Sequence, residues 1–415
     1  MAERWAGGDE RGDAVRAMLL LAARAELGTS DDACLGECAS LPLDWARFAA
    51  RASAHGLAPL AWRLVAEHPG VVTPPPQTVS RLRNAYAASA VSHMRMTSEL
   101  NAVLRASRES GVYPIVLKGP VLARYAYRDP ALRPYTDLDL LVAEKDWAAF
   151  HRVVVELGYV AEQPEYPELP ARLTAEDMND HALKYSGGSK TSLDCTLDPL
   201  ELGLRMRCLE DAFALAEEVP FGEQRGLVLS PEYQFLTTCV HLNRHGYRRL
   251  IWLMDIATLL ARSSSLDWER VAAISAAEGV SASIRYTLMQ VDRLLGVSVP
   301  ADALERLRPS RLRSALWRRA WPEGDVGTSA GRELVLIVFP RSLAVSQLMG
   351  NLAATGRVGD KMHYLVRRAF PPNSYLDGKV SAGPGAGYAR RLTLFYGTAI
   401  RRRLAAAAGP PRGPS

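Results

Sequence analysis

Residues 113–142 read YPIVLKGPVLARYAYRDPALRPYTDLDLLV, and the fold prediction rests on this stretch. Its last six residues, DLDLLV at 137–142, alternate charged and apolar side chains before they end in an apolar pair. In a β-strand successive side chains point to opposite faces, so Asp137 and Asp139 share one face. Leucine and valine side chains occupy the other face. We therefore predict a strand that buries an apolar face and presents two neighbouring carboxylates on the other.

The carboxylates of Asp137 and Asp139 form a candidate metal site. Like charges repel at this spacing, and a fold seldom keeps them together unless a cation lies between them. Mg²⁺ prefers oxygen ligands of this kind and usually arrives with substrate phosphates. Taken alone, an Asp-x-Asp motif more often marks a solvated strand end than a metal site, so its surroundings decide the interpretation.

The segment Lys118-Gly119-Pro120 favours nucleotide chemistry at this site. It lies between an apolar run that predicts a strand at 113–117 and a helical pattern at 120–127. At a strand-to-helix junction, free N–H groups and the helix dipole attract anions, and proline suits the first helical position. A turn that attracts phosphate, followed by a strand with two carboxylates, is what nucleotide-dependent phosphoryl chemistry requires.

The run LKG at 117–119, then Tyr125, then LRPYTDLDLLV at 132–142 resembles the bacterial family of uncharacterised nucleotidyltransferases. That family is a branch of the DNA polymerase β-like nucleotidyltransferase superfamily. The resemblance extends from about Leu43 to about Leu307 and is far more specific than a bare Asp-x-Asp. It implies an α+β fold: a polymerase β-like mixed sheet flanked by helices, with N-terminal helices before it and a C-terminal helical bundle after it.

The resemblance also implies a third carboxylate, because such enzymes hold two Mg²⁺ ions (or Mn²⁺) with three acids on adjacent strands. Asp194 fits this position, since it lies on the polar face of a predicted hairpin strand that follows the turn Gly187-Gly188. An exposed strand aspartate is the competing interpretation. Many family members have His-Trp after this acid, whereas here Cys-Thr follows, and Asp198 is the fallback. The predicted catalytic and metal-binding residues are Asp137, Asp139 and Asp194.

Four residues are the candidates for binding the nucleotide. Lys118, with Gly119 beside it, is the predicted phosphate contact; a solvated loop lysine is the alternative. Arg133 is predicted either to neutralise the triphosphate or to pair with the carboxylates. Tyr125 matches a family position, although a core or rim aromatic explains it equally well.

Changes in composition, and the proline and glycine residues that interrupt the helical and strand patterns, divide the chain into six parts. We expect a disordered N-terminus (1–12), an N-terminal helical segment (13–110), the nucleotidyltransferase α/β core (111–229), a helical bundle (230–308), a C-terminal helical extension (309–408) and a disordered tail (409–415). Within them the pattern predicts helices from near Asp44 to Gly56, over 79–110 and 145–157, and from Pro231 onward, with a polar loop at 163–180.

Composition places the chain among ordinary globular proteins, with 48% hydrophobic residues, 23% charged residues and a net charge of +5 over 415 residues. The five cysteines are an odd number without paired metal spacing, which argues against zinc and favours free thiols in a reducing cytoplasm. No secretory signal is visible, and no segment reaches the roughly 20 apolar residues that a membrane span needs. We therefore expect a cytoplasmic protein.

Several polar residues of the predicted helical half have structural interpretations. His241 and His245 share a helix face, but they lack the glutamate and third ligand of a zinc protease, so we interpret them as packing or substrate-rim residues. Asp255 is expected to be a buried, hydrogen-bonded structural residue. The arginine clusters at 311–319 and 401–403 fit solvated helix faces better than an RNA-binding surface, since no aromatic-basic motif accompanies them.

The leading hypothesis is a nucleotidyltransferase of the EC 2.7.7 type that moves a nucleoside monophosphate from an NTP, with ATP expected, to an unknown acceptor and releases pyrophosphate. The acceptor is a small molecule or a macromolecule, and nucleic acid is only weakly supported. A catalytically inactive nucleotide- or partner-binding protein on the same fold is the alternative. A third interpretation is a modifier that resembles antibiotic-adenylylating enzymes, with the helical half shaping the acceptor pocket.

Overall fold

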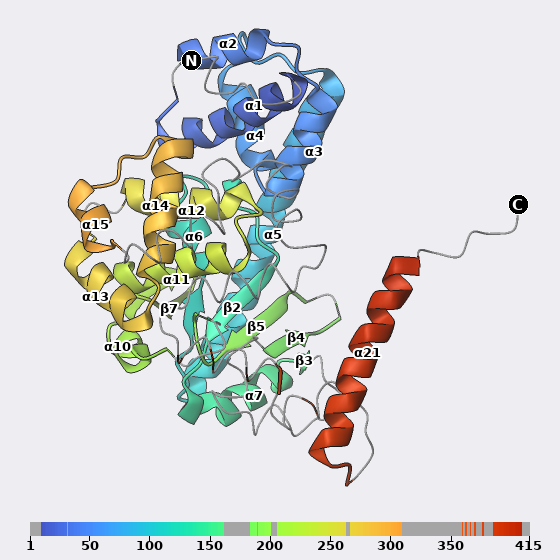
Figure 1. Ribbon diagram of the computed structural model, residues 1–415, viewed down its shortest axis with the longest axis vertical. Coiled ribbons are helices and arrows are strands. Elements are labelled where there is room, and N and C mark those ends of the chain that lie inside the picture. The colour runs from blue at the N-terminus through green and yellow to red at the C-terminus, as the bar shows by residue number, and fades with distance from the viewer. Residues whose placement is uncertain are drawn as a thin grey trace, which may run out of the picture.

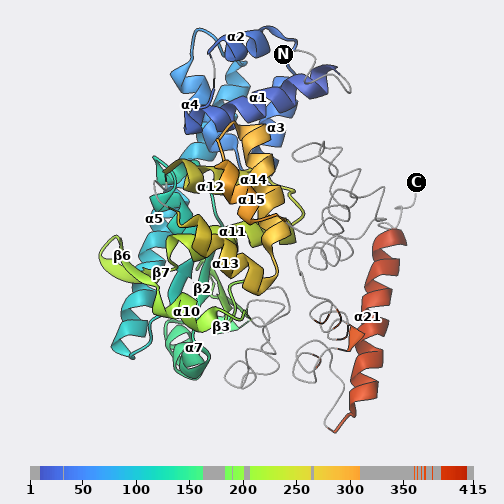
Figure 2. The same cartoon turned by 60° about the vertical axis from the view of Figure 1, so that its left-hand side comes forward.

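The computed structural model describes residues 10–30, 32–161, 183–188, 190–200, 206–262, 266–308 and 385–408, together with residues 359, 362, 366, 369, 370 and 376. Residues 1–9 of the predicted disordered N-terminus (1–12), the predicted loop at 163–180, the predicted tail at 409–415 and most of residues 309–384 of the predicted C-terminal extension (309–408) lie outside the described residues. The predicted helix at the C-terminal end is present as α21 (Tyr388–Ala408), which stands apart from the other described elements in Figures 1 and 2.

The N-terminal segment contains five helices: α1 (Glu10–Leu27), α2 (Asp32–Ser40), α3 (Trp45–His55), α4 (Ala58–Glu67) and α5 (Pro76–Glu109). The first of them, α1, begins at Glu10, within the range 1–12 that we expected to be disordered. The predicted start and end of α3 are confirmed. Asp44 caps it by accepting a hydrogen bond from the backbone N–H of Arg47, and Gly56 ends it in the left-handed conformation.

A seven-stranded mixed sheet lies beside these helices, with the strand order β3-β4-β5-β2-β1-β7-β6. The strands are β1 (Ile115–Leu117), β2 (Asp137–Leu141), β3 (Val160–Ala161), β4 (Leu183–Ser186), β5 (Ser192–Thr196), β6 (Glu217–Phe221) and β7 (Gln224–Val228). β1 and β2 are adjacent and antiparallel, whereas β2 pairs with β5 in parallel. The predicted mixed sheet with adjacent motif strands, and the predicted hairpin that became β4 and β5, are therefore confirmed.

Four short or amphipathic elements connect the central strands: α6 (Gly119–Tyr125), the 3-10 turns η2 (Pro130–Leu132) and η3 (Glu144–Asp146), and α7 (Trp147–Glu156). Gly158 follows α7 with a φ of 82°, the left-handed conformation typical of a glycine that ends a helix. The predicted boundaries differ from the observed ones by one to three residues, because the ends of elements depend on tertiary contacts.

The two faces of the sheet pack against different parts of the chain. Val116, Leu138 and Leu193 belong to an apolar core that also contains side chains of α5 and α7. Leu117 and Leu141 belong to a second, larger core, shared with the N-terminal helices and the C-terminal helical bundle. The alternation that the sequence predicted thus separates two cores on opposite sides of one sheet.

Six helices form the bundle that covers this second face: α10 (Leu209–Ala214), α11 (Pro231–Arg244), α12 (Leu250–Arg262), α13 (Trp268–Glu278), α14 (Ser281–Leu295) and α15 (Ala301–Arg306). α11 and α12 contribute side chains to the core that contains Leu117 and Leu141. α11 begins with Pro231 at its first position, as predicted. The family-like arrangement of helices, mixed sheet and helical bundle is therefore present.

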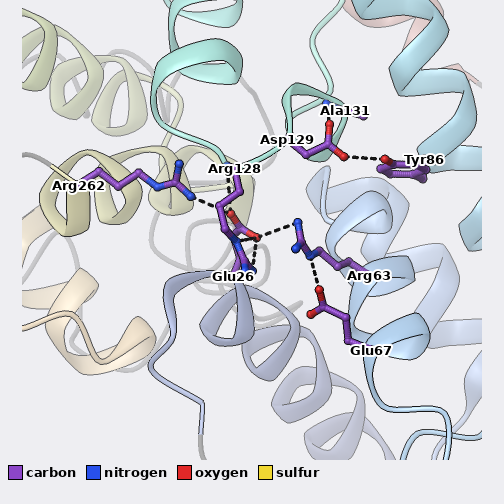
Figure 3. Close-up of polar contacts among 8 residues, drawn as sticks. All are labelled: Glu26, Arg63, Glu67, Tyr86, Arg128, Asp129, Ala131 and Arg262. Atoms are coloured by element: carbon purple, nitrogen blue, oxygen red, sulfur yellow. Dashed lines mark hydrogen bonds and ion pairs between the residues drawn. The ribbon is translucent and has the colours of Figure 1, made fainter.

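A buried carboxylate joins the N-terminal helices to the rest of the molecule (Figure 3). Glu26 of α1 accepts hydrogen bonds from Arg128 Nε (3.1 Å) and Nη2 (2.9 Å), and Arg262 Nη2 of α12 lies 3.3 Å from its other oxygen. Arg63 Nη1 of α4 is 3.8 Å away. One acidic side chain thus binds residues from three other segments, which fixes how these segments lie relative to one another.

The sequence analysis missed the hairpin formed by β6 and β7. Its sequence, EEVPFGEQRGLV at 217–228, contains Pro220 and lacks a clear alternation. β6 is an edge strand, where a proline is tolerated because no neighbouring strand needs its N–H. Gly222, with a φ of 68°, makes the turn, and β7 continues the sheet by pairing in parallel with β1.

Candidate active site

Three carboxylates lie on one face of adjacent central strands. Asp139 is aligned with Leu117 of β1 and with Asp194 of β5, and residues aligned in register point to the same face. Because Leu117 packs in the core shared with the helical bundle, Asp139 and Asp194 also face that bundle. Asp137 lies two residues earlier in β2 and shares this face. The site is therefore between the sheet and the C-terminal helices.

Each of two carboxylates has a lysine partner. Lys118 Nζ is 2.8 Å from Asp139 Oδ1, and both side chains are largely buried. Lys184 Nζ, from the β4 residue aligned with Asp194, is 3.3 Å from Asp194 Oδ2. Ser192 Oγ also donates to Asp194 Oδ1 at 3.3 Å. The two ammonium groups offset part of the negative charge that the strands bring together.

Repulsion and burial affect the proton affinity of the acids. Burial raises the pKa of Asp137, and the charge of Asp194 raises it further, while Lys118 and Arg133 act in the opposite direction. Burial also raises the pKa of Asp194, with a contribution from Asp139 that Lys184 opposes. The three acids therefore form one electrostatic group, which a bound cation would stabilise.

The donor set fits a hard divalent cation in its chemistry, since all three groups are carboxylates on one side of the sheet. In the described parts of the chain, however, no group of three or more His, Cys, Asp or Glu side chains is arranged to hold a metal ion. Lysine ammonium groups contact the carboxylates of Asp139 and Asp194. Coordination by all three acids would require Lys118 or Lys184 to move toward another anion.

Lys118 has an unusual backbone conformation, with a φ of 48° and a ψ of −110°. Side chains other than glycine rarely adopt such a φ, and strained residues of this kind concentrate at functional sites. The next residue, Gly119, lies so close to the ring of Tyr135 that a Cβ would be 2.9 Å from it. The LKG motif therefore holds the Lys118 side chain over Asp139 at the end of β1.

Arg133 has a different environment from the one predicted. It is only 6% exposed, and its Nε and Nη2 donate to Asp255 of α12 at 3.1 and 2.8 Å. Tyr127 donates a third hydrogen bond to Asp255 at 2.9 Å. Asp255 is 1% exposed, which confirms the prediction of a buried, hydrogen-bonded structural aspartate. Arg133 thus joins the α/β core to the helical bundle. Its charge acts on the carboxylate of Asp137, whose pKa it lowers, while its hydrogen bonds go to Asp255.

Tyr125 and Asp198 make contacts with other parts of the chain. Tyr125 is exposed, packs edge-on against Phe221 and donates to the backbone carbonyl of Pro220, so it supports the β6–β7 hairpin. The carboxylate of Asp198 accepts hydrogen bonds from the backbone N–H groups of Leu200 (2.8 Å) and Met206 (2.5 Å). Asp198 therefore shapes its own loop, and Asp194 is the acid aligned with Asp139.

The α11–α12 turn brings further polar groups to this face. Burial holds the pKa of His241 well below its ordinary value, and Lys118 and neighbouring cations add to the effect. The rings of His241, His245 and Trp252 lie against one another, with centroids 4.5 to 5.3 Å apart. Arg249 lies over Trp252, with its guanidinium carbon 5.4 Å from the ring centroid. Sequence reasoning missed Arg249, because an arginine in a basic turn carries no distinguishing pattern.

Comparison with protein families matches residues 42–296, more than half of the chain, to the family described as "Uncharacterised nucleotidyltransferase". Searches among curated proteins and among solved structures found no significant match. Within the described residues, no helix is long and apolar enough to cross a membrane. The matched range contains the LKG motif, both motif strands, Asp194 and the α11–α12 pair. The chain therefore belongs to this family of uncharacterised nucleotidyltransferases.

Proposed function

We propose that this nucleotidyltransferase moves a nucleoside monophosphate from an NTP to an acceptor and releases pyrophosphate. The observation that carries the proposal is the register of β2 and β5, which aligns Asp139 with Asp194 and leaves Asp137 on the same face. Carboxylates on neighbouring strands, facing a covering helical bundle, are what a metal-assisted phosphoryl transfer requires.

In this proposal Mg²⁺ is the cofactor, with Mn²⁺ as an alternative, and Asp137, Asp139 and Asp194 hold it when the nucleotide is present. Bound Mg²⁺ supplies positive charge to the triphosphate and to the leaving pyrophosphate. Lys118 moves from Asp139 to the phosphates as they enter, because its Nζ already lies within 2.8 Å of the carboxylate that the cation would take.

The transfer step forms a bond between an acceptor oxygen and the α-phosphorus and breaks the bond from that phosphorus to the pyrophosphate oxygen. The acceptor loses a proton, and we assign its removal to the Asp194 carboxylate. ATP is the nucleotide that we expect to be used.

A nucleotide-binding protein without transfer activity is the second candidate. The observation that favours it is the described arrangement of the acids, in which no three groups are placed around one metal position. The two functions differ in one readout, which is whether an α-phosphate label moves to another molecule.

The test is to incubate the protein with Mg²⁺, each of the four NTPs labelled at the α-phosphate, and a cell extract, and to follow the label. Labelling of an acceptor with release of pyrophosphate supports the proposal. Binding of NTP without any labelling, in extracts and with Mn²⁺ as well, would favour the binding protein.

Asp137→Asn separates a catalytic role of this carboxylate from a structural one. Burial and the charge of Asp194 raise the pKa of Asp137, so its ionised form is disfavoured in the folded protein. We expect this variant to lose labelling while its melting temperature stays equal to that of the parent or rises, since one of two repelling charges is removed. Full labelling by Asp137→Asn would exclude Asp137 from the site, and a large fall in melting temperature would assign it a structural role.

A further inference from the structure

The α11–α12 turn, residues 245–249, is fixed in a strained conformation beside the carboxylates. Among the described residues two non-glycine residues have a positive φ, Lys118 at 48° and Tyr247 at 55°. Tyr247 is buried, and its hydroxyl forms a hydrogen bond of 2.7 Å with Thr287 Oγ1 of α14. The strain is thus held by the bundle, and it sets the direction in which the next residues of the turn enter the site.

Arg249, two residues after this strained position, has a buried Nε atom with no hydrogen-bond partner among the described residues. Its guanidinium group lies over Trp252, and Nη2 is close enough to Gly56 that a Cβ there would be 2.9 Å from it. Buried polar groups almost always have partners, so an unpaired guanidinium N–H is an unusual feature. An acceptor group from outside the chain would satisfy it.

His241, one helical turn before the end of α11, has the same property. Its Nδ1 atom is buried and has no hydrogen-bond partner among the residues described. Its ring lies edge-on to Trp252, at a centroid distance of 5.3 Å. Two unsatisfied side-chain nitrogens therefore flank one tryptophan on the helices that cover the carboxylate face.

The charges around Arg249 indicate what would bind there. Burial lowers the pKa of Arg249 and Arg133 adds to this, whereas Asp255 and Asp137 oppose it. The guanidinium is thus in electrostatic contact with the Asp137 carboxylate and is repelled by a buried arginine. Lys118 likewise acts on His241. Cationic groups from two separate segments, Lys118 after β1 and Arg249 in the α11–α12 turn, thus act on the acids and on His241. This distribution of charge suits a polyanion that carries its own divalent cation.

We propose that Arg249 and His241 bind the phosphate groups of the nucleoside triphosphate, so that the nucleotide is held between Lys118 on the sheet and the α11–α12 turn. This inference rests on the proposed function and assigns to the helical bundle a nucleotide-binding role. Arg249 supplies two parallel donors to phosphate oxygens, and His241 supplies an uncharged hydrogen bond.

The test uses calorimetry to measure the equilibrium binding of each Mg-NTP and of Mg-tripolyphosphate to the parent protein and to the Arg249→Gln variant. Loss of a charged hydrogen bond to phosphate weakens binding by about tenfold to a hundredfold, for the nucleotides and for tripolyphosphate alike. The matched control is Arg248→Gln, because Arg248 lies in the same turn but is exposed. It should bind within about twofold of the parent, as expected for a surface charge.

Stability provides a second readout. Arg249→Gln removes a buried donor without a partner, so its melting temperature should equal or exceed that of the parent. Arg249→Lys keeps the charge beside Asp137 and Asp255 but loses the planar fork, and its nucleotide affinity should lie between those of the parent and the glutamine variant. A large fall in melting temperature together with parent-like binding by Arg249→Lys would assign Arg249 a structural role.

The outcomes separate this inference from the proposed function. If the parent binds no Mg-NTP, the proposed function fails and the inference fails with it. If the parent binds and Arg249→Gln binds within about twofold, only the inference fails. Weakened binding of nucleotides but not of tripolyphosphate would exclude a phosphate contact. Full nucleotide binding with loss of transfer would place Arg249 at a phosphorylated or otherwise anionic acceptor and would also overturn the assignment.

Discussion

Lys118 and Asp194 each form an ion pair within the carboxylate group, yet we expect their removal to affect different steps. Asp194→Ala should bind Mg-NTP nearly as well as the parent but lose transfer by about 10²–10⁴-fold or more, the typical effect of losing a general base. Lys118→Ala should weaken NTP binding first, because it removes a contact to phosphates that are present before reaction. Binding by calorimetry and transfer by α-phosphate labelling separate the two effects.

The opposite result would contradict these assignments. In that case Asp194→Ala would bind NTP more weakly, and Lys118→Ala would lower only the rate of transfer. Asp198→Asn serves as a control for a nearby acid. Since its carboxylate accepts two backbone hydrogen bonds, this variant should lose stability without a selective effect on transfer.

Backbone strain at Lys118 allows a second prediction at this scale. Lys118→Ala and Lys118→Gly both lose the ion pair with Asp139, but glycine accepts a φ of 48° without steric cost. Glycine also raises the entropy of the unfolded chain, which offsets part of the gain. We expect Lys118→Gly to be more stable than Lys118→Ala by about 1 kcal/mol, measured by urea denaturation. Equal or lower stability of the glycine variant would mean that the backbone of Lys118 stores no strain.

At the scale of secondary structure, the end of α3 makes stability depend on pH. His55 lies there, and its Nδ1 accepts a hydrogen bond of 3.4 Å from the backbone N–H of Leu250, the first residue of α12. Burial lowers the pKa of His55 from 6.5 to about 4, with contributions from Arg51 and Arg249. In the unfolded chain His55 takes up a proton below its ordinary pKa, whereas the folded protein resists protonation down to about pH 4.

The stability contribution of His55 is therefore complete above pH 6.5 and is lost as the pH falls toward 4. The loss is at most about 3 kcal/mol, from the size of the shift. His55→Gln should reduce the slope of unfolding free energy against pH between 7 and 5, measured by urea denaturation at each pH. A variant that keeps the parent's slope would show that His55 titrates normally in the folded protein.

Elements differed in how well the sequence predicted them. The alternation in DLDLLV predicted both the strand and its carboxylate face, and Asp44 and Gly56 predicted the ends of α3, because these signals are local. The hairpin of β6 and β7 could not be predicted in this way, since Pro220 and a weak alternation hide an edge strand. The alignment of Asp139 with Asp194 follows from a parallel pairing between residues 55 positions apart, which local patterns do not encode.

At the scale of the whole molecule, long-range polar pairs decided what the sequence could not. Arg133 was a plausible phosphate ligand until its partner was known, and that partner, Asp255, is 122 residues away. Arg249 carried no pattern of its own, and His241 was predicted only as a packing or substrate-rim residue. Both became candidates for phosphate binding because the fold places α11 and α12 over the carboxylate face. Fold class was thus predictable from motif and periodicity, whereas the helical side of the site was not.

The buried pair of Arg133 and Asp255 supplies the prediction at this scale. Removing one partner leaves an uncompensated buried charge, so Asp255→Asn should destabilise the protein by about 3–5 kcal/mol. The double variant Arg133→Met with Asp255→Leu should be less destabilised than Asp255→Asn, because two apolar side chains remove both charges. The measurement is a double-mutant cycle by denaturant unfolding, built from the single variants Arg133→Met and Asp255→Leu and their combination, with Tyr127→Phe included to account for the third hydrogen bond.

A double variant as unstable as the single one would mean that the two side chains do not act as a pair. Additive losses from Asp255→Leu and Arg133→Met would lead to the same conclusion.

The face of the sheet that carries the acids has a consequence for how the chain folds during synthesis. Leu117 and Leu141 pack in a core shared with α11 and α12, which begin about ninety residues after β2 ends. At ribosomal rates of roughly 5–20 residues per second, this face of the nascent strands stays without its covering helices for several seconds. A chain halted near residue 229 would therefore expose apolar leucines beside three acids and would need a chaperone to stay dispersed. The boundary before α11 separates two kinds of secondary structure, but it does not separate two folding units.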